Sequence, residues 1–241
     1  MTTIAQIITD AYQANNLIAL SVIPSAAEQD KALRYTNRLF KSLFGNELGD
    51  QLTDAVLSDG GITYPDYAIS YPTTNFVVRA NTRLINKTTA SVTFYMPLNP
   101  QPGSRVSFID ITGTLATYPL TANGSDRLIE SVTADKTLNV NFEADDWFYR
   151  DDLASWQKIS SLALTDDFPL PEEFEELFIT LLALRLDATL NVALAEEVGY
   201  VMKQMVRKLR ARYRQTVEKP SELGILRTPL ITRAIWRTTD A

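Results

Sequence analysis

Apolar residues recur at helical spacing at the start of the chain. A capping box formed by Thr3 and Gln6 opens one such stretch, and a second box, Ser25 with Glu28, opens a longer one. The paired side chains of such a box satisfy backbone N–H groups that the first turn of a helix leaves without partners. Gly45 then supplies a C-terminal stop. The pattern therefore predicts a pair of helices.

The period changes to two between Thr89 and Ser161. Short runs rich in β-branched and aromatic residues follow one another, and turn signals such as Asn123-Gly124 separate them. Such a series of short strands is typical of a small antiparallel sandwich or barrel. The preceding stretch, residues 46–88, gives mixed signals, and we expect it to wrap over the surface of the fold.

Helical signals return at Pro171. Proline suits the first position of a helix, and Glu172 and Glu173 complement the helix dipole in the first turn. A long amphipathic stretch follows and runs to about Val217, after which Pro220 prevents the helix from continuing. The remaining residues show no clear period. We therefore predict two more helices and an irregular C-terminal tail.

Helices at both ends of the chain enclose the block of short strands. We predict an α+β fold, in which N- and C-terminal helices form a bundle that carries an inserted antiparallel β-sandwich or barrel and an extended C-terminal tail. The predicted helical core comprises residues 1–88 and 162–217, the inserted β domain residues 89–161, and the tail residues 218–241.

The chain of 241 residues contains no histidine and no cysteine. The Ser-His and Cys-His nucleophile pairs therefore cannot form, and a zinc site would have to use carboxylates alone. We expect no catalytic residues, no metal and no cofactor, and hence a protein that is not an enzyme. A hydrolase with two catalytic carboxylates is the weakest alternative, because no pair of acids stands out.

Hydropathy argues against a membrane protein. No apolar run approaches the roughly 20 residues that span a bilayer, and the N-terminus lacks the positive region of a secretory signal. We therefore expect a water-facing protein that is made in a cytoplasm and does not bind a membrane.

Two segments of the sequence resemble segments of a known family. LPEEFEE at residues 170–176 runs into LALRL at residues 182–186. They follow an N-terminal helix that carries Leu33, Arg34, Asn37, Arg38 and Leu39. Together with the layout of helices around a β-rich insert, these segments resemble the head-to-tail adaptor, or connector, family of short-tailed bacteriophages. The resemblance covers roughly residues 1–50 and 165–217.

Members of this family form a ring, commonly twelvefold, beneath the portal protein, and DNA passes through the ring. The resemblance therefore implies a virion protein at the head–tail junction, made in the host cytoplasm, with a role in tail assembly and viral genome ejection. The implied partners are the portal protein, a downstream tail protein (nozzle or tail tube) and further copies of the chain. The DNA would pass without sequence-specific binding.

The C-terminal segment of the chain, residues 201–241, supplies the predicted subunit contact. Residues 201–241 carry ten basic and three acidic side chains, whereas the rest of the chain is strongly acidic. Basic residues at spacings of four, three and four fall on one face of the long helix. A solvated face or a contact with DNA phosphates are alternatives, but a basic lining would hold DNA that has to slide. The predicted subunit-interface residues are Lys203, Arg207, Arg210 and Arg214.

The predicted tail, residues 218–241, supplies the expected portal contact. In the family this segment extends from the body and docks on the portal, and here it is basic, apolar and irregular. Trp and Arg are the residues that dominate binding hot spots. A disordered end is the alternative. The predicted portal-binding residues are Arg227, Arg233, Ile235, Trp236 and Arg237.

The insert, which is also similar to a β module of phage tail-tube and adaptor proteins, contains two clusters with possible chemistry. The aromatic cluster consists of Trp147, Phe148, Tyr149 and Trp156. It would suit either a sugar-stacking platform or core packing, and a carbohydrate-binding accessory virion protein is our alternative function. The acidic cluster consists of Asp145, Asp146, Asp151 and Asp152. It would suit calcium or, more simply, solvated loop charge.

Overall fold

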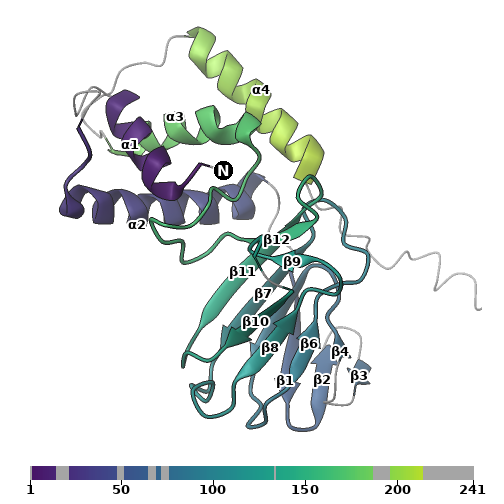
Figure 1. The fold of residues 1–241 in the computed structure, drawn as a ribbon. Coiled ribbons are helices and arrows are strands. Elements are labelled where there is room, and N and C mark those ends of the chain that lie inside the picture. Colours follow the sequence, from purple (N-terminus) through teal and green to yellow (C-terminus); the bar gives the residue numbers. More distant parts are fainter. Residues whose placement is uncertain are drawn as a thin grey trace, which may run out of the picture.

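The computed structural model describes residues 2–14, 22–47, 52–64, 69–71, 76–132, 134–186 and 196–213. Four α-helices form one part of the molecule, and two β-sheets form the other (Figure 1). The helices are α1 (Ile4–Ala14), α2 (Ala26–Ser42), α3 (Glu175–Leu186) and α4 (Glu196–Tyr213). A π-helical turn, η1 (Leu43–Glu47), extends α2, and a 3-10 turn, η3 (Glu172–Phe174), precedes α3.

Both predicted capping boxes are present. The backbone N–H of Thr3 donates to Gln6 Oε1 at 2.8 Å, and that of Ser25 donates to Glu28 Oε2 at 2.8 Å. Each bond satisfies a backbone donor at the point where the chain enters a helix. The two N-terminal helices are therefore confirmed where the sequence predicted them.

Helices from the two ends of the chain share one hydrophobic core. The rings of Phe40 in α2 and Phe178 in α3 stack with their centroids 4.4 Å apart, and α1 packs along α3 (Figure 1). The Asn37 side chain accepts from the backbone N–H of Leu162 at 2.9 Å and donates to its carbonyl oxygen at 3.2 Å. These bonds fix α2 to the segment that leads back from the sheets to α3.

The sheets differ in size. In spatial order, the larger sheet contains β3 (Ile69–Tyr71), β2 (Gly61–Tyr64), β1 (Thr53–Ser58), β5 (Thr82–Asn86), β7 (Arg105–Asp110), β11 (Ala144–Arg150), β12 (Ser155–Lys158) and β9 (Leu128–Ile129). The smaller sheet contains β10 (Asp135–Leu138), β8 (Leu120–Asn123), β6 (Thr93–Tyr95) and β4 (Phe76–Val77).

The chain passes back and forth between these sheets. From β4 to β9, successive strands belong alternately to the smaller and the larger sheet. Strands β1, β5 and β7 pair in parallel in the larger sheet, and β4, β6 and β8 do so in the smaller one. Each circuit therefore adds one parallel strand to each sheet, which gives a β-solenoid-like arrangement flanked by antiparallel pairs such as β7 with β11.

The predicted fold class is wrong. The protein is a mixed α/β fold with a solenoid-like pair of sheets, not a helical bundle with an inserted antiparallel β-sandwich or barrel. The prediction failed because turn signals and period-two alternation look the same whether the next strand pairs as a hairpin or crosses to the other sheet. The register that joins Thr82 to Val106 links distant segments and leaves no local mark in the sequence.

The segment that we expected to wrap over the surface, residues 46–88, instead supplies central strands. Strand β5 lies between β1 and β7, and its Leu84 is fully buried. A strand with a neighbour on each side satisfies its backbone groups within the sheet, so it can be buried without water. This is why β5 can lie in the interior rather than on the surface of the fold. The predicted division of the chain into domains stays a prediction.

Strand β11 joins the two hydrophobic cores. Its side chains alternate between the faces of the sheet, so that Trp147 packs in the core between the sheets and Phe148 packs in the helical core. The Phe148 ring lies 5.1 Å from that of Phe44 and 5.6 Å from that of Tyr213. The outer face of the larger sheet therefore supports the helices.

The end of α4 rests on the loop before β7. Gly103 in that loop has a φ of 84°, and a Cβ atom there would lie 2.5 Å from the carbonyl oxygen of Tyr213. Only glycine accommodates both the backbone conformation and this close approach. The loop thus lets the last described turn of α4 reach the β part of the molecule.

Candidate functional site

Helix α4 runs along the outside of the helical part and ends beside the sheets (Figure 1). Leu209 and Tyr213 are buried, and three further apolar side chains pack partly against the helical core. These are Met202, Met205 and Val206. The residues of the helix that the structure describes as exposed are Tyr200, Val201, Lys203, Arg207, Lys208, Arg210 and Ala211. The helix therefore contacts its own chain along a narrow seam and presents a broad basic face.

This basic face contains three of the four predicted subunit-interface residues. Lys203, Arg207 and Arg210 are exposed on α4, whereas Arg214 lies outside the described residues. Their spacing of four and three explains why one face holds them all. Their role in a subunit contact stays a prediction.

Sequence reasoning missed the role of Arg212. Its Nη1 lies 2.7 Å from Glu173 Oε1, and its Nη2 lies 3.3 Å from Asp151 Oδ1. The two pairs connect the end of α4 to η3, just before α3, and to the turn after β11. The sequence contains one signal for this difference, because Arg212 lies two positions after Arg210 and residues two apart on a helix do not share a face. That spacing indicates that Arg212 does not belong to the basic face.

Tyr213 completes the attachment of α4. Its side chain is buried beside Phe148 and Phe174, and burial raises the pKa of its hydroxyl group well above the ordinary value. Tyr213 therefore stays neutral at any physiological pH and acts as a packing residue.

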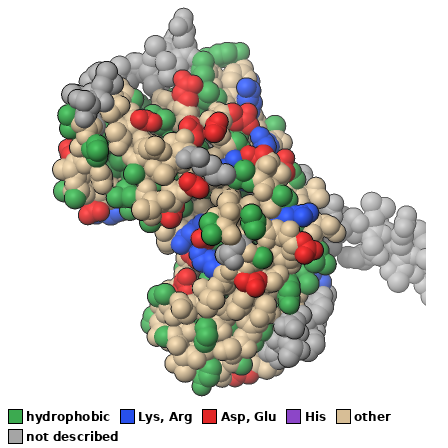
Figure 2. Space-filling view, viewed as in Figure 1, with side chains coloured by type: hydrophobic (Ala, Val, Ile, Leu, Met, Phe, Trp, Pro, Cys, Tyr) green, Lys and Arg blue, Asp and Glu red, His purple; other side chains and the backbone are tan. Residues whose placement is uncertain are grey.

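Acidic side chains are scattered over the helical part, whereas basic ones gather where it meets the sheets (Figure 2). The exposed acidic residues of α1, α2 and α3 and their flanking turns are Asp10, Glu28, Asp30, Asp167, Glu172, Glu173 and Glu176. Helix α2 also carries four exposed basic residues, Lys31, Arg34, Arg38 and Lys41, so the exposed acidic residues are in excess on α1 and around the start of α3.

The five predicted portal-binding residues lie outside the described residues. They are Arg227, Arg233, Ile235, Trp236 and Arg237. The predicted tail, residues 218–241, therefore stays a prediction as a whole.

The aromatic cluster belongs to the protein core. Trp147, Phe148 and Trp156 are fully buried, and Tyr149 is 7% exposed. The indole Nε1 of Trp147 donates to Glu130 Oε1 at 3.2 Å, which satisfies its only polar atom. The interpretation of this cluster as core packing is confirmed, and none of the four rings offers an open face to a sugar.

Residues of the acidic cluster form ion pairs with basic side chains. Asp145 is buried and lies 3.1 Å from Lys158 Nζ and 3.7 Å from Lys136 Nζ. Asp152 forms a two-fold pair with Arg150, with one of the bonds 2.6 Å long. Across the described ranges there is no group of three or more carboxylate, histidine or cysteine ligands that could hold a metal.

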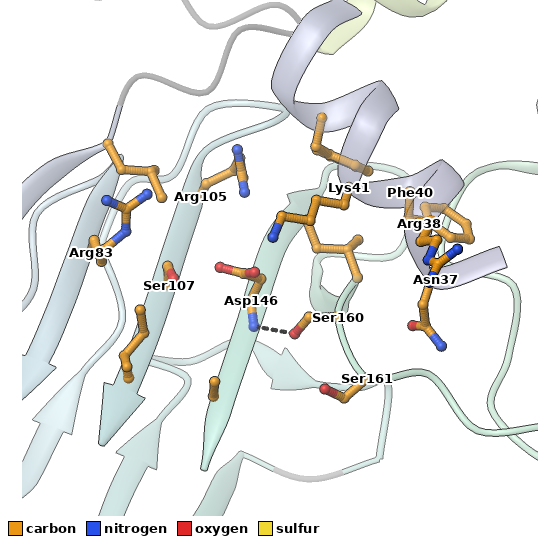
Figure 3. Close-up of a pocket in the computed structure, with 15 residues that line it drawn as sticks. Asn37, Arg38, Phe40, Lys41, Arg83, Arg105, Ser107, Asp146, Ser160 and Ser161 are labelled. Atoms are coloured by element: carbon orange, nitrogen blue, oxygen red, sulfur yellow. Dashed lines mark hydrogen bonds between the residues drawn. The ribbon is translucent and has the colours of Figure 1, made fainter. Parts of the chain in front are cut away.

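A hollow of about 470 Å³ separates α2 from the outer face of the larger sheet (Figure 3). Strand alternation forms its sheet wall, because Arg105, Ser107 and Ile109 face outward while Val106 and Phe108 pack between the sheets. In the described part of its lining, the hollow has four basic side chains and one acidic side chain, Asp146. The basic ones are Arg38, Lys41, Arg83 and Arg105.

Neither the protein-family models nor the curated proteins compared with the chain give a match. No helix in the described part of the chain is both long and apolar enough to cross a membrane. Function must therefore be inferred from the residues and their arrangement.

Proposed function

We propose that the protein is a structural head-to-tail adaptor of a tailed bacteriophage. In this proposal, twelve copies form a ring under the portal protein, connect the capsid to a downstream tail protein and line the conduit for DNA. The observation that carries the proposal is the broad exposed face of α4, which is basic and includes apolar side chains. Such a face suits a contact with another protein more than a contact with water.

The composition of the α4 face supports a protein partner. Tyr200 is 64% exposed and Val201 lies beside it in the same helix. Lys203 and Arg207 follow on the exposed side. An apolar pair bordered by charged residues resembles an interface with an apolar centre and a polar rim.

The charge distribution supports a contact between copies of the chain. A basic face on one copy and acidic side chains on another attract each other, so two different surfaces of the chain can join neighbouring subunits. Such heterologous contacts close into a ring when the rotation between neighbouring subunits permits it. The absence of histidine and cysteine from the sequence also favours a structural role over nucleophilic catalysis.

Electron microscopy of the full chain mixed with particles of the cognate portal protein would test the proposed function directly. The proposal predicts an additional ring of density on one end of the portal. Portal particles that stay bare at saturating concentrations of the chain would contradict it.

Reversing the charge of α4 is expected to prevent ring formation. The double variant Lys203→Glu/Arg207→Glu places acidic side chains on the face that would meet an acidic neighbour, and like charges across an interface cost several kcal/mol. Mass photometry and electron microscopy with portal particles would measure assembly, and circular dichroism would verify the fold. The matched control is Lys31→Glu/Lys87→Glu, which reverses two exposed lysines elsewhere. Equal assembly of both double variants would argue against α4 as the subunit contact.

Removing residues 218–241 is expected to abolish portal binding without unfolding the body. The described residues of both hydrophobic cores all precede this segment, so thermal unfolding of the truncated chain should stay cooperative. Co-sedimentation with portal particles would measure binding. Undiminished binding by the truncated chain would show that the portal contact lies elsewhere.

A further inference from the structure

We propose that the basic hollow between α2 and the larger sheet is a binding site for a short acidic peptide segment of a partner protein. The partner segment would insert a carboxylate among the basic side chains and an apolar side chain beside the aliphatic residues of the wall. This site is separate from the α4 face, so it does not depend on the proposed ring.

The charge of the hollow favours an anionic ligand. Among the described residues that line it, four are basic and one, Asp146, is acidic. Arg83 forms an ion pair of 3.4 Å with Asp54, but both side chains are well exposed, and exposed pairs are weak. Within the described part of the chain, no carboxylate forms an ion pair with Arg38 or Lys41.

The position of Arg105 strengthens the attraction. Its side chain is 5% exposed, and its guanidinium carbon lies 5.4 Å from the centre of the Phe44 ring. This contact orients the cation beside the hollow. Because water screens a buried charge poorly, Arg105 adds to the positive potential of the hollow.

The side chains that line the hollow come from both α2 and the strands of the larger sheet. Lys41 extends from α2, whereas Arg83, Arg105 and Asp146 extend from strands (Figure 3). The hydroxyl oxygen of Ser160 accepts from the backbone N–H of Asp146 at 2.7 Å, which leaves its own hydrogen available to donate. A ligand with acceptor groups therefore finds donors on more than one side.

Size and apolar lining favour a peptide over DNA. A volume of about 470 Å³ holds a few side chains, whereas a DNA duplex is far too wide to enter a hollow of this volume. Leu52 and Ile109, which are partly exposed, and Ala144, which is exposed, contribute apolar surface to the same walls. A phosphate alone would leave this surface without a partner, but a segment with an acidic residue next to an apolar one would cover both.

The test uses a displayed library of random peptides, selected on the full-length protein. Enriched peptides should carry Asp or Glu beside an aromatic or aliphatic residue. In fluorescence anisotropy, the synthesised peptides should bind at least about tenfold more weakly to Lys41→Glu and to Arg83→Glu, and also when their own acids are replaced by amides. Affinity should fall as salt is added.

Matched controls separate the site from general charge effects. Lys31→Glu and Lys87→Glu make the same charge change at exposed positions away from the hollow and should bind the peptides as the unaltered protein does. Lys41→Glu should still form rings with portal particles, which separates this site from the proposed function. The proposal is overturned if no peptide is enriched, if binding is insensitive to Lys41→Glu and Arg83→Glu, or if pyrophosphate binds the hollow as tightly as the peptides.

Discussion

Replacing Trp147 by alanine is expected to lower the free energy of unfolding by about 3 to 5 kcal/mol, the cost of truncating a buried tryptophan. Trp147 is fully buried between the two sheets and pairs with Val106 across β11 and β7. Its removal would open a cavity that the flanking strands can fill only partly, and would leave Glu130 without the indole donor. Urea denaturation followed by circular dichroism would measure the change.

The control for this prediction is Tyr200→Ala, which truncates an exposed aromatic residue of α4. Tyr200 makes one side-chain hydrogen bond that the structure describes, from Gln204 Nε2 at 2.9 Å. Its loss should change the free energy of unfolding by about 0.5 kcal/mol or less. A similarly small effect at Trp147 would mean that this side chain is not in the core, and would reopen the sugar-binding interpretation.

Replacing Asp110 by alanine is expected to cost about 3 kcal/mol of stability, because one buried and three partly buried donors would lose their acceptor at once. Asp110 is 3% exposed and stands at the end of β7. Its oxygens accept from Asn86 Nδ2 at 3.1 Å, from the backbone N–H of Phe142 at 3.0 Å, and from both the backbone and the hydroxyl of Thr112. These bonds join the end of β5 to the turns that follow β7 and precede β11.

Phe142 adds to the expected cost of losing Asp110. Its φ of 62° lies in the left-handed region, which is unfavourable for a bulky residue. The bond from its backbone N–H to Asp110 helps to hold this conformation. The control Asp54→Ala removes an exposed acid with one ion pair, for which we expect a loss of about 1 kcal/mol or less.

The contribution of Asp110 to stability should also depend on pH. Burial would raise the pKa of this carboxyl group, but the bonds from Phe142, Thr112 and Asn86 outweigh burial and lower the pKa below its ordinary value of 3.8. The folded state therefore favours the charged form. The resulting stabilisation is fully present above pH 3.8 and is lost as the pH falls through the folded-state pKa.

The variant Asp110→Asn isolates this effect. Its stability should lie below that of the unaltered protein at neutral pH, and the difference should shrink as the pH falls below about 4, because Asp110 of the unfolded chain takes up a proton there while that of the folded chain stays charged down to its lower pKa. Denaturation series at several pH values would measure the difference. A gap that stays constant down to pH 2 would contradict the role of the charged carboxylate.

Local sequence determined the starts of the helices. The capping boxes at Thr3 and Ser25 act within one helical turn, so the residues that decide the structure are neighbours in the chain. The same holds for the basic face of α4, because helical spacing alone brings Lys203, Arg207 and Arg210 to one side. These features needed no knowledge of the rest of the fold.

Local sequence determined the placement of the buried aromatic cluster only in part. Alternation along β11 indicates that Trp147 and Phe148 face opposite sides, but it does not say what covers either side. The structure supplies a second sheet for Trp147 and the helices for Phe148. An aromatic residue that faces a covering layer is core, whereas the same residue on an open face could bind a ligand.

By itself the sequence determined the helices, the positions of many short strands and the lack of histidine and cysteine chemistry. Only the tertiary structure decided that β5 pairs in parallel with β1 and β7 rather than with its neighbours in sequence, and that Arg38, Arg83 and Arg105 meet around one hollow. A helix is stabilised by bonds between residues a few positions apart. A strand takes as its partner whichever distant segment satisfies its backbone and buries its face, and the chain must be folded before that segment is known.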